Sequence, residues 1–248
     1  RAPTNYSMEN IMTSKTLDLS PARWIWYPSG RCLQNTFVLF RRELDLSAAP
    51  KAATGWIVAD SRYRLFVNGQ RVQWGPAPAD PQHLEADPLD LTSLLHPGKN
   101  VIGCEVLFYG HGEGTWPLGK PGFLFQLDIE TADGDKTSLV SDSSWQAHIA
   151  RSWQPGHYTR WYLRALQEEF DACLYPYGWS ATGFSSDTDW LPAMEQNCPA
   201  NMPVLCSTYD DYMMDIIGDQ NRCDLSPRSI PLLNEELIPV KCLAESLW

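Results

Sequence analysis

The sequence predicts an all-β protein folded as an antiparallel β-sandwich. Short apolar segments separated by Pro, Gly and Asp turns run along most of the 248 residues, with little helical periodicity. Residues 122–131 place every second apolar side chain on one face, which is the two-residue period of a strand. Asn68-Gly69 joins two alternating segments and suits a two-residue hairpin turn, whose central residues both need a positive φ.

The expected strands follow these segments in chain order. Phe37 begins a continuous apolar run typical of a buried strand, and residues 100–109 are rich in β-branched and aromatic side chains. Asp133-Gly134 forms the turn after the alternating segment. Residues 163–170 fit either a helix or an extended segment. The expected strands are 37–46, 55–59, 63–67, 70–72, 100–109, 122–131, 136–140, 145–150 and 209–217.

Composition divides the chain into three parts. Residues 1–19 are polar and aperiodic, and we interpret them as an N-terminal arm. Residues 20–225 contain the strands and form the sandwich domain. Residues 226–248 contain three prolines and an apolar segment that stops at Trp248, so we expect a linker toward a further domain.

Charge and hydropathy argue against two classes of partner. The formal net charge of −11 opposes binding to nucleic acid, whose phosphates need a basic surface, and to anionic membranes. No apolar stretch approaches the roughly 20 residues that span a bilayer. Residues 1–18 show no signal peptide, and the chain starts with Arg1 rather than Met. Earlier removal of such a peptide agrees with the periplasmic or extracellular location that we expect.

The cysteine and carboxylate patterns predict no metal site and no cofactor. Seven cysteines occur without the C-x-x-C spacing that zinc sites normally use. A domain of this size does not need a dense disulfide framework, although one bridge among Cys198, Cys206 and Cys223 stays open. The Asp133-Gly134 turn lacks ligand side chains at the positions that an EF-hand calcium loop requires.

A series of short motifs occurs in a fixed order along the chain. A strand leading into Val67-Asn68-Gly69 is followed by a Gly-Pro loop at 74–81 and by DLTSLLHPGKNVI at 90–102. Further motifs are Arg23–Pro28, Ser141–Trp145, Phe170–Ala172, Gly178-Trp179 and Asp187–Ala193. Together they resemble the galactose-binding-like β-sandwich in the N-terminal region of bacterial α-L-rhamnosidases. The resemblance covers roughly residues 22–247 and favours the jelly-roll form of the sandwich.

The resemblance implies that this chain accompanies a catalytic domain and does not perform the chemistry. The family's acid and base lie in a downstream (α/α)-barrel, so no residue here inherits a catalytic role. The whole enzyme would hydrolyse terminal α-L-rhamnosyl groups, and its expected partners are that domain and rhamnose-containing glycans. Glu168-Glu169 and Glu235-Glu236 cannot flank one glycosidic bond, because neighbours on a strand point to opposite faces. Cys173 and Ser180 replace the family's usual Arg and Asp, so roles of those side chains do not transfer.

The most suggestive loop runs from Tyr109 to Trp116. Its three glycines free the backbone and leave polar groups beside an aromatic ring, as recognition of a sugar requires. The alternative is a flexible loop whose Trp116 packs on its own domain. The predicted carbohydrate-binding residues are Trp74, Asp80, Tyr109, His111, Glu113 and Trp116.

Two other functions fit the same sequence. One is a stand-alone lectin-like domain with no enzyme attached, and the other is a purely structural spacer between domains. Several hundred further residues after Trp248 in the natural reading frame would separate the rhamnosidase module from the lectin. A complete lack of glycan binding would favour the spacer.

Overall fold

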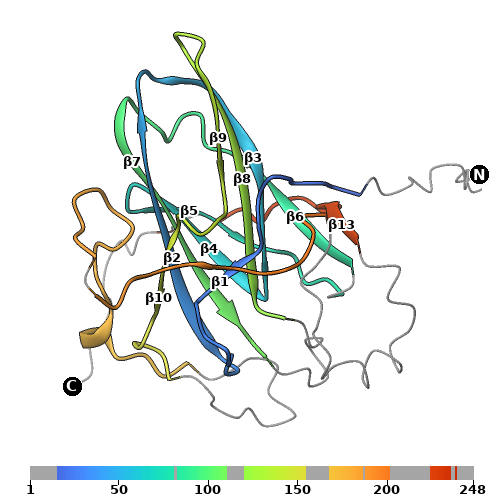
Figure 1. Cartoon of the computed structure of the whole chain (residues 1–248), viewed down its shortest axis with the longest axis vertical. Coiled ribbons are helices and arrows are strands. Elements are labelled where there is room, and N and C mark those ends of the chain that lie inside the picture. Colours follow the sequence, from blue (N-terminus) through green and yellow to red (C-terminus); the bar gives the residue numbers. More distant parts are fainter. Residues whose placement is uncertain are drawn as a thin grey trace, which may run out of the picture.

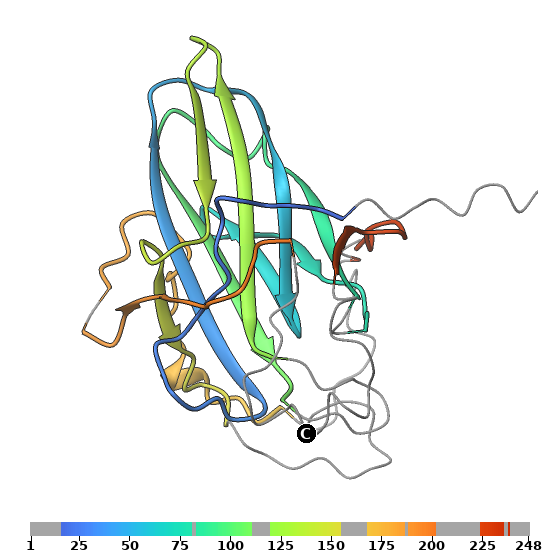
Figure 2. The same ribbon diagram turned by 45° about the vertical axis from the view of Figure 1, so that its right-hand side comes forward.

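Two β-sheets face each other and form a sandwich, which Figures 1 and 2 show as two layers of long strands. The expectation of an all-β sandwich is therefore confirmed. No helix among the described residues is long and apolar enough to cross a membrane. The computed structural model describes residues 16–80, 83–110, 120–154, 168–186, 188–201, 224–235 and 238.

The first sheet has the order β12-β1-β8-β3-β6-β13, and β9 pairs with β8 beside this path. Its strand pairs are antiparallel except for β13, which pairs with β6 in parallel. Its strands are β1 Ile25–Trp26, β3 Pro50–Asp60, β6 His83–Asp90, β8 Gly122–Thr131, β9 Lys136–Val140, β12 Met194–Glu195 and β13 Asp224–Pro227.

The second sheet has the order β11-β10-β2-β7-β4-β5 and is antiparallel throughout. A short 3-10 helix, η2 at Ala172–Leu174, lies beside β10 and β2 in both views (Figures 1 and 2). The strands are β2 Thr36–Leu46, β4 Arg62–Val67, β5 Gln70–Gly75, β7 Gly98–Phe108, β10 Gln146–Ile149 and β11 Leu191–Pro192.

The main core lies between the two sheets. Alternate residues of each strand point inward, so that Tyr63 and Leu65 of β4 are buried while Arg64 between them is not. Trp145 lies at the centre, and its ring meets those of Phe123 and Phe125 edge to face, each at 5.4 Å between centroids. Such buried aromatic contacts contribute beyond the apolar area that they remove from water.

A second apolar cluster covers the outer face of the second sheet. Phe37 and Leu39 of β2 point outward, yet both are buried under the chain that follows β10. That chain contributes Trp153, Trp179 and Trp190, which is why so many tryptophans of this sequence are interior. Because both faces of its first half are covered, β2 starts with a continuous apolar run at Phe37–Phe40, and it alternates only beyond Arg41.

Residues before β1 pack on the outer face of the first sheet. Leu19 and Trp24 are buried there against Val58, Leu124 and other apolar side chains. The backbone N–H of Leu17 donates to the carbonyl of Leu225 at 2.6 Å. The arm expected at residues 1–19 thus joins the sandwich in the part that is described, and residues 1–15 lie outside the described range.

The last described segment connects the edges of the two sheets. β13 extends the first sheet, with Leu225 fully buried. Further along, the Glu235 carboxylate pairs with Arg71 of β5, at the edge of the second sheet. We call residues 224–235 the C-terminal strap. The domain boundary expected at residue 225 stays a prediction, but contacts with the sandwich continue through Glu235.

A buried polar network holds the strap in place. Arg228 Nη1 donates to Asp87 Oδ1 at 2.8 Å, and the Tyr63 hydroxyl donates to Asp87 Oδ2. Gln73 Nε2 completes the network by donating to the Tyr63 oxygen at 2.8 Å. The side chains of Arg228 and Asp87 are 4% and 0% exposed. Burial raises the pKa of Asp87, and the hydrogen bonds from Arg228 and Tyr63 oppose that rise.

Most of the expected strands are confirmed. The ends of β8 and β9 agree with the expected residues, whereas β3 begins at Pro50, earlier than expected. β6 was not expected, because Pro88 and acidic residues interrupt its apolar pattern. The short β13 was not expected either. The strand expected at 209–217 lies outside the described residues.

The turn between β4 and β5 gives a direct test of backbone conformation. Asn68 and Gly69 have φ values of 51° and 85°, as the hairpin signal predicts. We expect Gly69→Ala to lower the free energy of unfolding by about 1–2 kcal/mol, because a Cβ disfavours positive φ. The added Cβ would also lie 3.3 Å from the Cβ of Ala181, a contact that increases the loss. Urea titration of the variant measures this. Gly30→Ala is the control, since its added Cβ meets no atom within 4 Å. Equal losses in both variants would contradict the conformational explanation.

Candidate functional site

Three strands converge at the lower end of the sandwich in Figure 1, where the predicted loop begins. Asp60 ends β3 and pairs with Gly122, which begins β8. The backbone N–H of Ser61 donates to the carbonyl of Leu107, near the end of β7, at 2.9 Å. The antiparallel register therefore brings the β3–β4 corner next to the chain that follows Phe108.

Asp60 is the most perturbed group at this end. Its side chain is nearly inaccessible, and its Oδ1 accepts a hydrogen bond from the Ser61 hydroxyl at 2.8 Å. Burial raises the pKa of Asp60 to about 7, while hydrogen bonds from Ser61 and from the backbone of Lys120 oppose the rise. A buried carboxyl that titrates near neutrality, beside loops, is a recognised mark of a functional site. Asp60 is not among the residues predicted from the sequence, although a carboxylate directly after the apolar pair Val58-Ala59 was a visible signal.

Tyr109 is fixed against the same corner. Its backbone N–H donates to the Ser61 hydroxyl oxygen at 3.2 Å, and its carbonyl accepts from the N–H of Asn35 at 3.1 Å. The side chain of Tyr109 is partly exposed. Of the predicted residues, Tyr109 is the one that the structure places directly beside Asp60 and Ser61.

Trp74 and Asp80 lie on different sides of this end. Trp74 pairs in register with Arg64, which points outward, so its indole lies on the outer face of the second sheet. Asp80 is exposed, and its carbonyl accepts from the N–H of His83 where β6 of the first sheet begins. Two described candidates thus flank the end from opposite sheets. The other predicted residues, His111, Glu113 and Trp116, lie outside the described residues.

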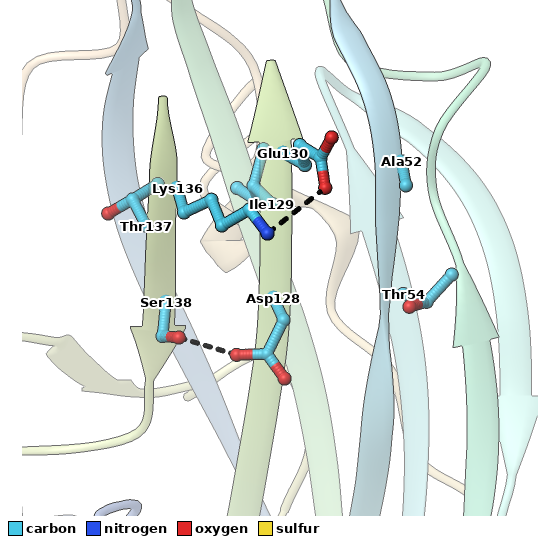
Figure 3. A pocket seen from close by; sticks show the side chains of 8 residues that line it. All are labelled: Ala52, Thr54, Asp128, Ile129, Glu130, Lys136, Thr137 and Ser138. Atoms are coloured by element: carbon cyan, nitrogen blue, oxygen red, sulfur yellow. Dashed lines mark hydrogen bonds and ion pairs between the residues drawn. The ribbon is translucent and has the colours of Figure 1, made fainter. Parts of the chain in front are cut away.

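A separate shallow pocket of about 410 Å³ lies on the outer face of the first sheet (Figure 3). Lys136 reaches toward Glu130, and the Ser138 hydroxyl donates to Asp128. The hydrogen bond from Lys51 holds the pKa of Glu130 below its usual range, so this carboxyl is a poor proton donor near neutral pH. The lining residues are Ala52, Thr54, Asp128, Ile129, Glu130, Lys136, Thr137 and Ser138, none of them aromatic.

Metal binding finds no support within the described ranges. They contain no group of three or more His, Cys, Asp or Glu side chains arranged to hold an ion. Cys198 is a free thiol, and Cys206 and Cys223 lie outside the described residues, so a bridge between those two stays a prediction. Burial raises the pKa of Cys198 to about 11, so the thiol stays protonated at neutral pH.

Comparison with known proteins identifies the family. A model of the α-L-rhamnosidase N-terminal domain matches residues 48–208, which is more than half of the chain. This chain belongs to the α-L-rhamnosidase N-terminal domain family. An α-L-rhamnosidase of Formosa agariphila is 30% identical over 118 residues, covering 43% of this chain and 13% of that protein.

Solved structures agree with this family. The GH78 rhamnosidase of Bacillus sp. GL1 is similar over 86% of this chain and 20% of its own, with 26% identity and a TM-score of 0.63. The lectin of Pleurotus ostreatus shares the fold, with 22% identity and a TM-score of 0.52, over 76% of this chain and 44% of its own. This rhamnosidase N-terminal domain therefore spans about an eighth to a fifth of the rhamnosidases that it matches.

Proposed function

We propose that this domain is the accessory β-sandwich of an α-L-rhamnosidase that hydrolyses terminal α-L-rhamnosyl groups. The observation that carries the proposal is the family match over residues 48–208, supported by the fold likeness to a rhamnosidase over 86% of the chain. The downstream partner is a catalytic domain in the same polypeptide. The protein acts in the periplasm or outside the cell, where glycans carrying such groups are available.

The second part of the proposal is that the lower end of the sandwich binds carbohydrate. Tyr109 is held beside the buried carboxyl of Asp60 by the hydroxyl of Ser61. The predicted loop continues directly from Tyr109, and loops on a rigid sandwich end are well suited to recognition. An aromatic ring next to hydrogen-bonding groups matches the apolar face and the hydroxyls of a sugar. Rhamnose-containing glycans are the ligands that this proposal names.

Sugar binding is expected to be weak. A single exposed sugar buries little surface, so the dissociation constant should be on the order of 1 mM, equivalent to about −4 kcal/mol. Loss of a stacking ring should weaken binding about fivefold, from the roughly 1 kcal/mol scale of aromatic contacts. NMR titration with L-rhamnose and rhamnosyl oligosaccharides, on wild type, Tyr109→Ala and Trp116→Ala, measures both effects.

A matched control distinguishes this end from the pocket on the first sheet. Thr137→Ala changes a lining residue of that pocket and should leave the titration unchanged. If Thr137→Ala weakens binding while Tyr109→Ala does not, the site lies on the first sheet and the proposal fails. If no sugar shifts any resonance, the domain is a structural spacer.

Catalysis is expected to require the longer polypeptide. We expect no release of nitrophenol from an aryl α-L-rhamnoside by residues 1–248 alone. Glycoside hydrolysis needs two carboxyls facing each other across the bond. Glu130, in the exposed pocket, is held ionised by Lys51 and cannot serve as the acid near neutral pH. Turnover that survives repurification and is abolished by Glu169→Gln would contradict the accessory role.

The lectin alternative has a simple separate test. A natural reading frame that encodes no further domain, together with millimolar sugar binding, would make the protein a stand-alone lectin. A reading frame that continues into a rhamnosidase domain would support the accessory role.

A further inference from the structure

The chain around η2 is fastened rigidly to the outer face of the second sheet. Phe170 forms a β-bridge with Trp153, and their rings lie 4.8 Å apart between centroids. The N–H of Asp171 donates to the carbonyl of Ser152 at 2.7 Å. The Asp171 carboxylate then accepts from the N–H of Cys173 and caps η2. This segment is therefore a fixed surface and not a loose loop.

The same segment divides its side chains between interior and solvent. Trp179 is buried, and its Nε1 donates to the Tyr175 hydroxyl oxygen at 2.8 Å, so these two residues form the inner side. Leu174 and Tyr177 have exposed fractions of 52% and 67%, and Phe170, whose ring also packs on Trp153, is 46% exposed. The exposed thiol of Cys173 lies next to Leu174 on η2. We call these four exposed residues the η2 patch.

The composition of the η2 patch fits a protein partner better than a sugar. The two aromatic rings, the leucine and the thiol carry no charge, and exposed Glu168, Glu169 and Asp171 flank them along the chain. Aromatic and apolar side chains without charge are typical of the centre of a protein–protein interface. A sugar site instead sets hydrogen-bonding groups beside its rings. The side chain of Leu174 has no hydrogen-bonding group, and the thiol of Cys173 is only a weak hydrogen-bond partner for a sugar hydroxyl.

We propose that the η2 patch is the surface on which the catalytic domain of the same polypeptide docks. This inference rests on the proposed function, because that function supplies the partner. The rhamnosidase of Bacillus sp. GL1 matches this domain over 20% of its own length, so there the domain is a minor part of one large chain. Domains joined in one chain hold each other at high effective concentration, so a modest apolar patch is enough for docking.

Cys173 gives a direct readout of this contact. In residues 1–248 alone, the exposed thiol should react readily with a maleimide. In the complete polypeptide, the docked catalytic domain should slow labelling of Cys173 at least tenfold, as measured by peptide mapping in a mass spectrometer. Cys32 is also exposed and lies in the loop before β2, so its labelling rate is the internal control and should stay the same.

Paired variants of the complete polypeptide test the patch itself. Leu174→Asp with Tyr177→Asp should restore labelling of Cys173 to the rate in residues 1–248, because two charges would oppose an apolar contact. Phe170 is left unchanged, since it packs on Trp153. The control is Ile230→Asp with Leu233→Asp, which removes two equally exposed apolar side chains from the strap. Cys173 should remain protected in the control.

The remaining outcomes separate docking from the proposed function. Equal labelling of Cys173 in both chains would overturn the docking proposal, even if the polypeptide hydrolyses rhamnosides. Protection that depends on protein concentration would assign the patch to a second copy, and protection that appears only with a rhamnosyl oligosaccharide would assign it to a glycan. Each result overturns docking. Protection without rhamnosidase activity would support docking and refute the assigned enzyme.

Discussion

Replacing Arg228 with methionine is expected to lower the free energy of unfolding by about 3–5 kcal/mol. The variant keeps the apolar stem but leaves the fully buried carboxyl of Asp87 without its cation. It also removes the donors to the carbonyls of Ile230 and Pro231, so the strap loses its turn. Breaking a buried ion pair costs far more than breaking an exposed one, because the remaining charge cannot be solvated. Denaturant titration of residues 1–248, with and without the substitution, measures the loss.

Two further variants make this prediction specific. Lys51→Met breaks an exposed pair with Glu130 and should cost far less stability than Arg228→Met, because water screens exposed charges. Asp87→Asn combined with Arg228→Met removes both charges and should recover part of the stability. If Arg228→Met costs no more than Lys51→Met, the Arg228–Asp87 pair does not fasten the strap, and the residues after β13 are a linker.

Raising the pH from 5 to 8 is expected to remove roughly 3 kcal/mol of stability through Asp60 alone. Its folded pKa of about 7 lies above the ordinary value of 3.8. Between these two values the folded chain keeps a proton that the unfolded chain has released, so the proton favours folding. This contribution is complete below about pH 4 and is lost as the pH rises through 7. Denaturant titrations at pH 5 and pH 8 on wild type and Asp60→Asn measure it.

The difference between the two proteins isolates Asp60 from other titrating groups. Asp60→Asn keeps a neutral side chain of the same shape, so its stability should change less between pH 5 and pH 8. Asp90→Asn is the control, because hydrogen bonding to Thr92 lowers the pKa of this exposed carboxyl, and it is ionised in both states above pH 5. Parallel curves for wild type and Asp60→Asn would show that Asp60 is ionised in the folded chain.

Local patterns predicted the strands that carry a clear signal in their own sequence, even where their partners are distant, as for β2 with β7 and β3 with β8. Residues 122–131 alternate cleanly because one face meets the core, and β8 has those ends. Asn68-Gly69 predicted its hairpin because few other residues accept its dihedral angles. The motif Gly178-Trp179 singled out a tryptophan that the structure buries. The sequence did not indicate that this tryptophan packs on the outer face of the second sheet.

Contacts between distant residues carry no local signal, and they account for what was missed. Arg228 and Asp87 are 141 residues apart, and an arginine after a Ser-Pro pair looks like an ordinary surface residue. The parallel pairing of β13 with β6 likewise joins residues that are far apart in the sequence and has no local signal. At the candidate site, the loop composition selected polar and aromatic residues but passed over Asp60, whose burial depends on the corner formed by three strands.

Burial of the first half of β2 on both faces limits where this domain tolerates redesign. Neighbouring residues of β2, such as Val38 and Leu39, are fully buried on opposite sides of the sheet. A substitution at either position would therefore disturb packing. The upper part of the first sheet differs, because the pocket around Thr54 and Ser138 opens to water. An engineer who wishes to add a label, a charge or a new binding surface should therefore work near the β8–β9 turn, at exposed residues such as Asp128 and Lys136, and leave β2 and β7 unchanged.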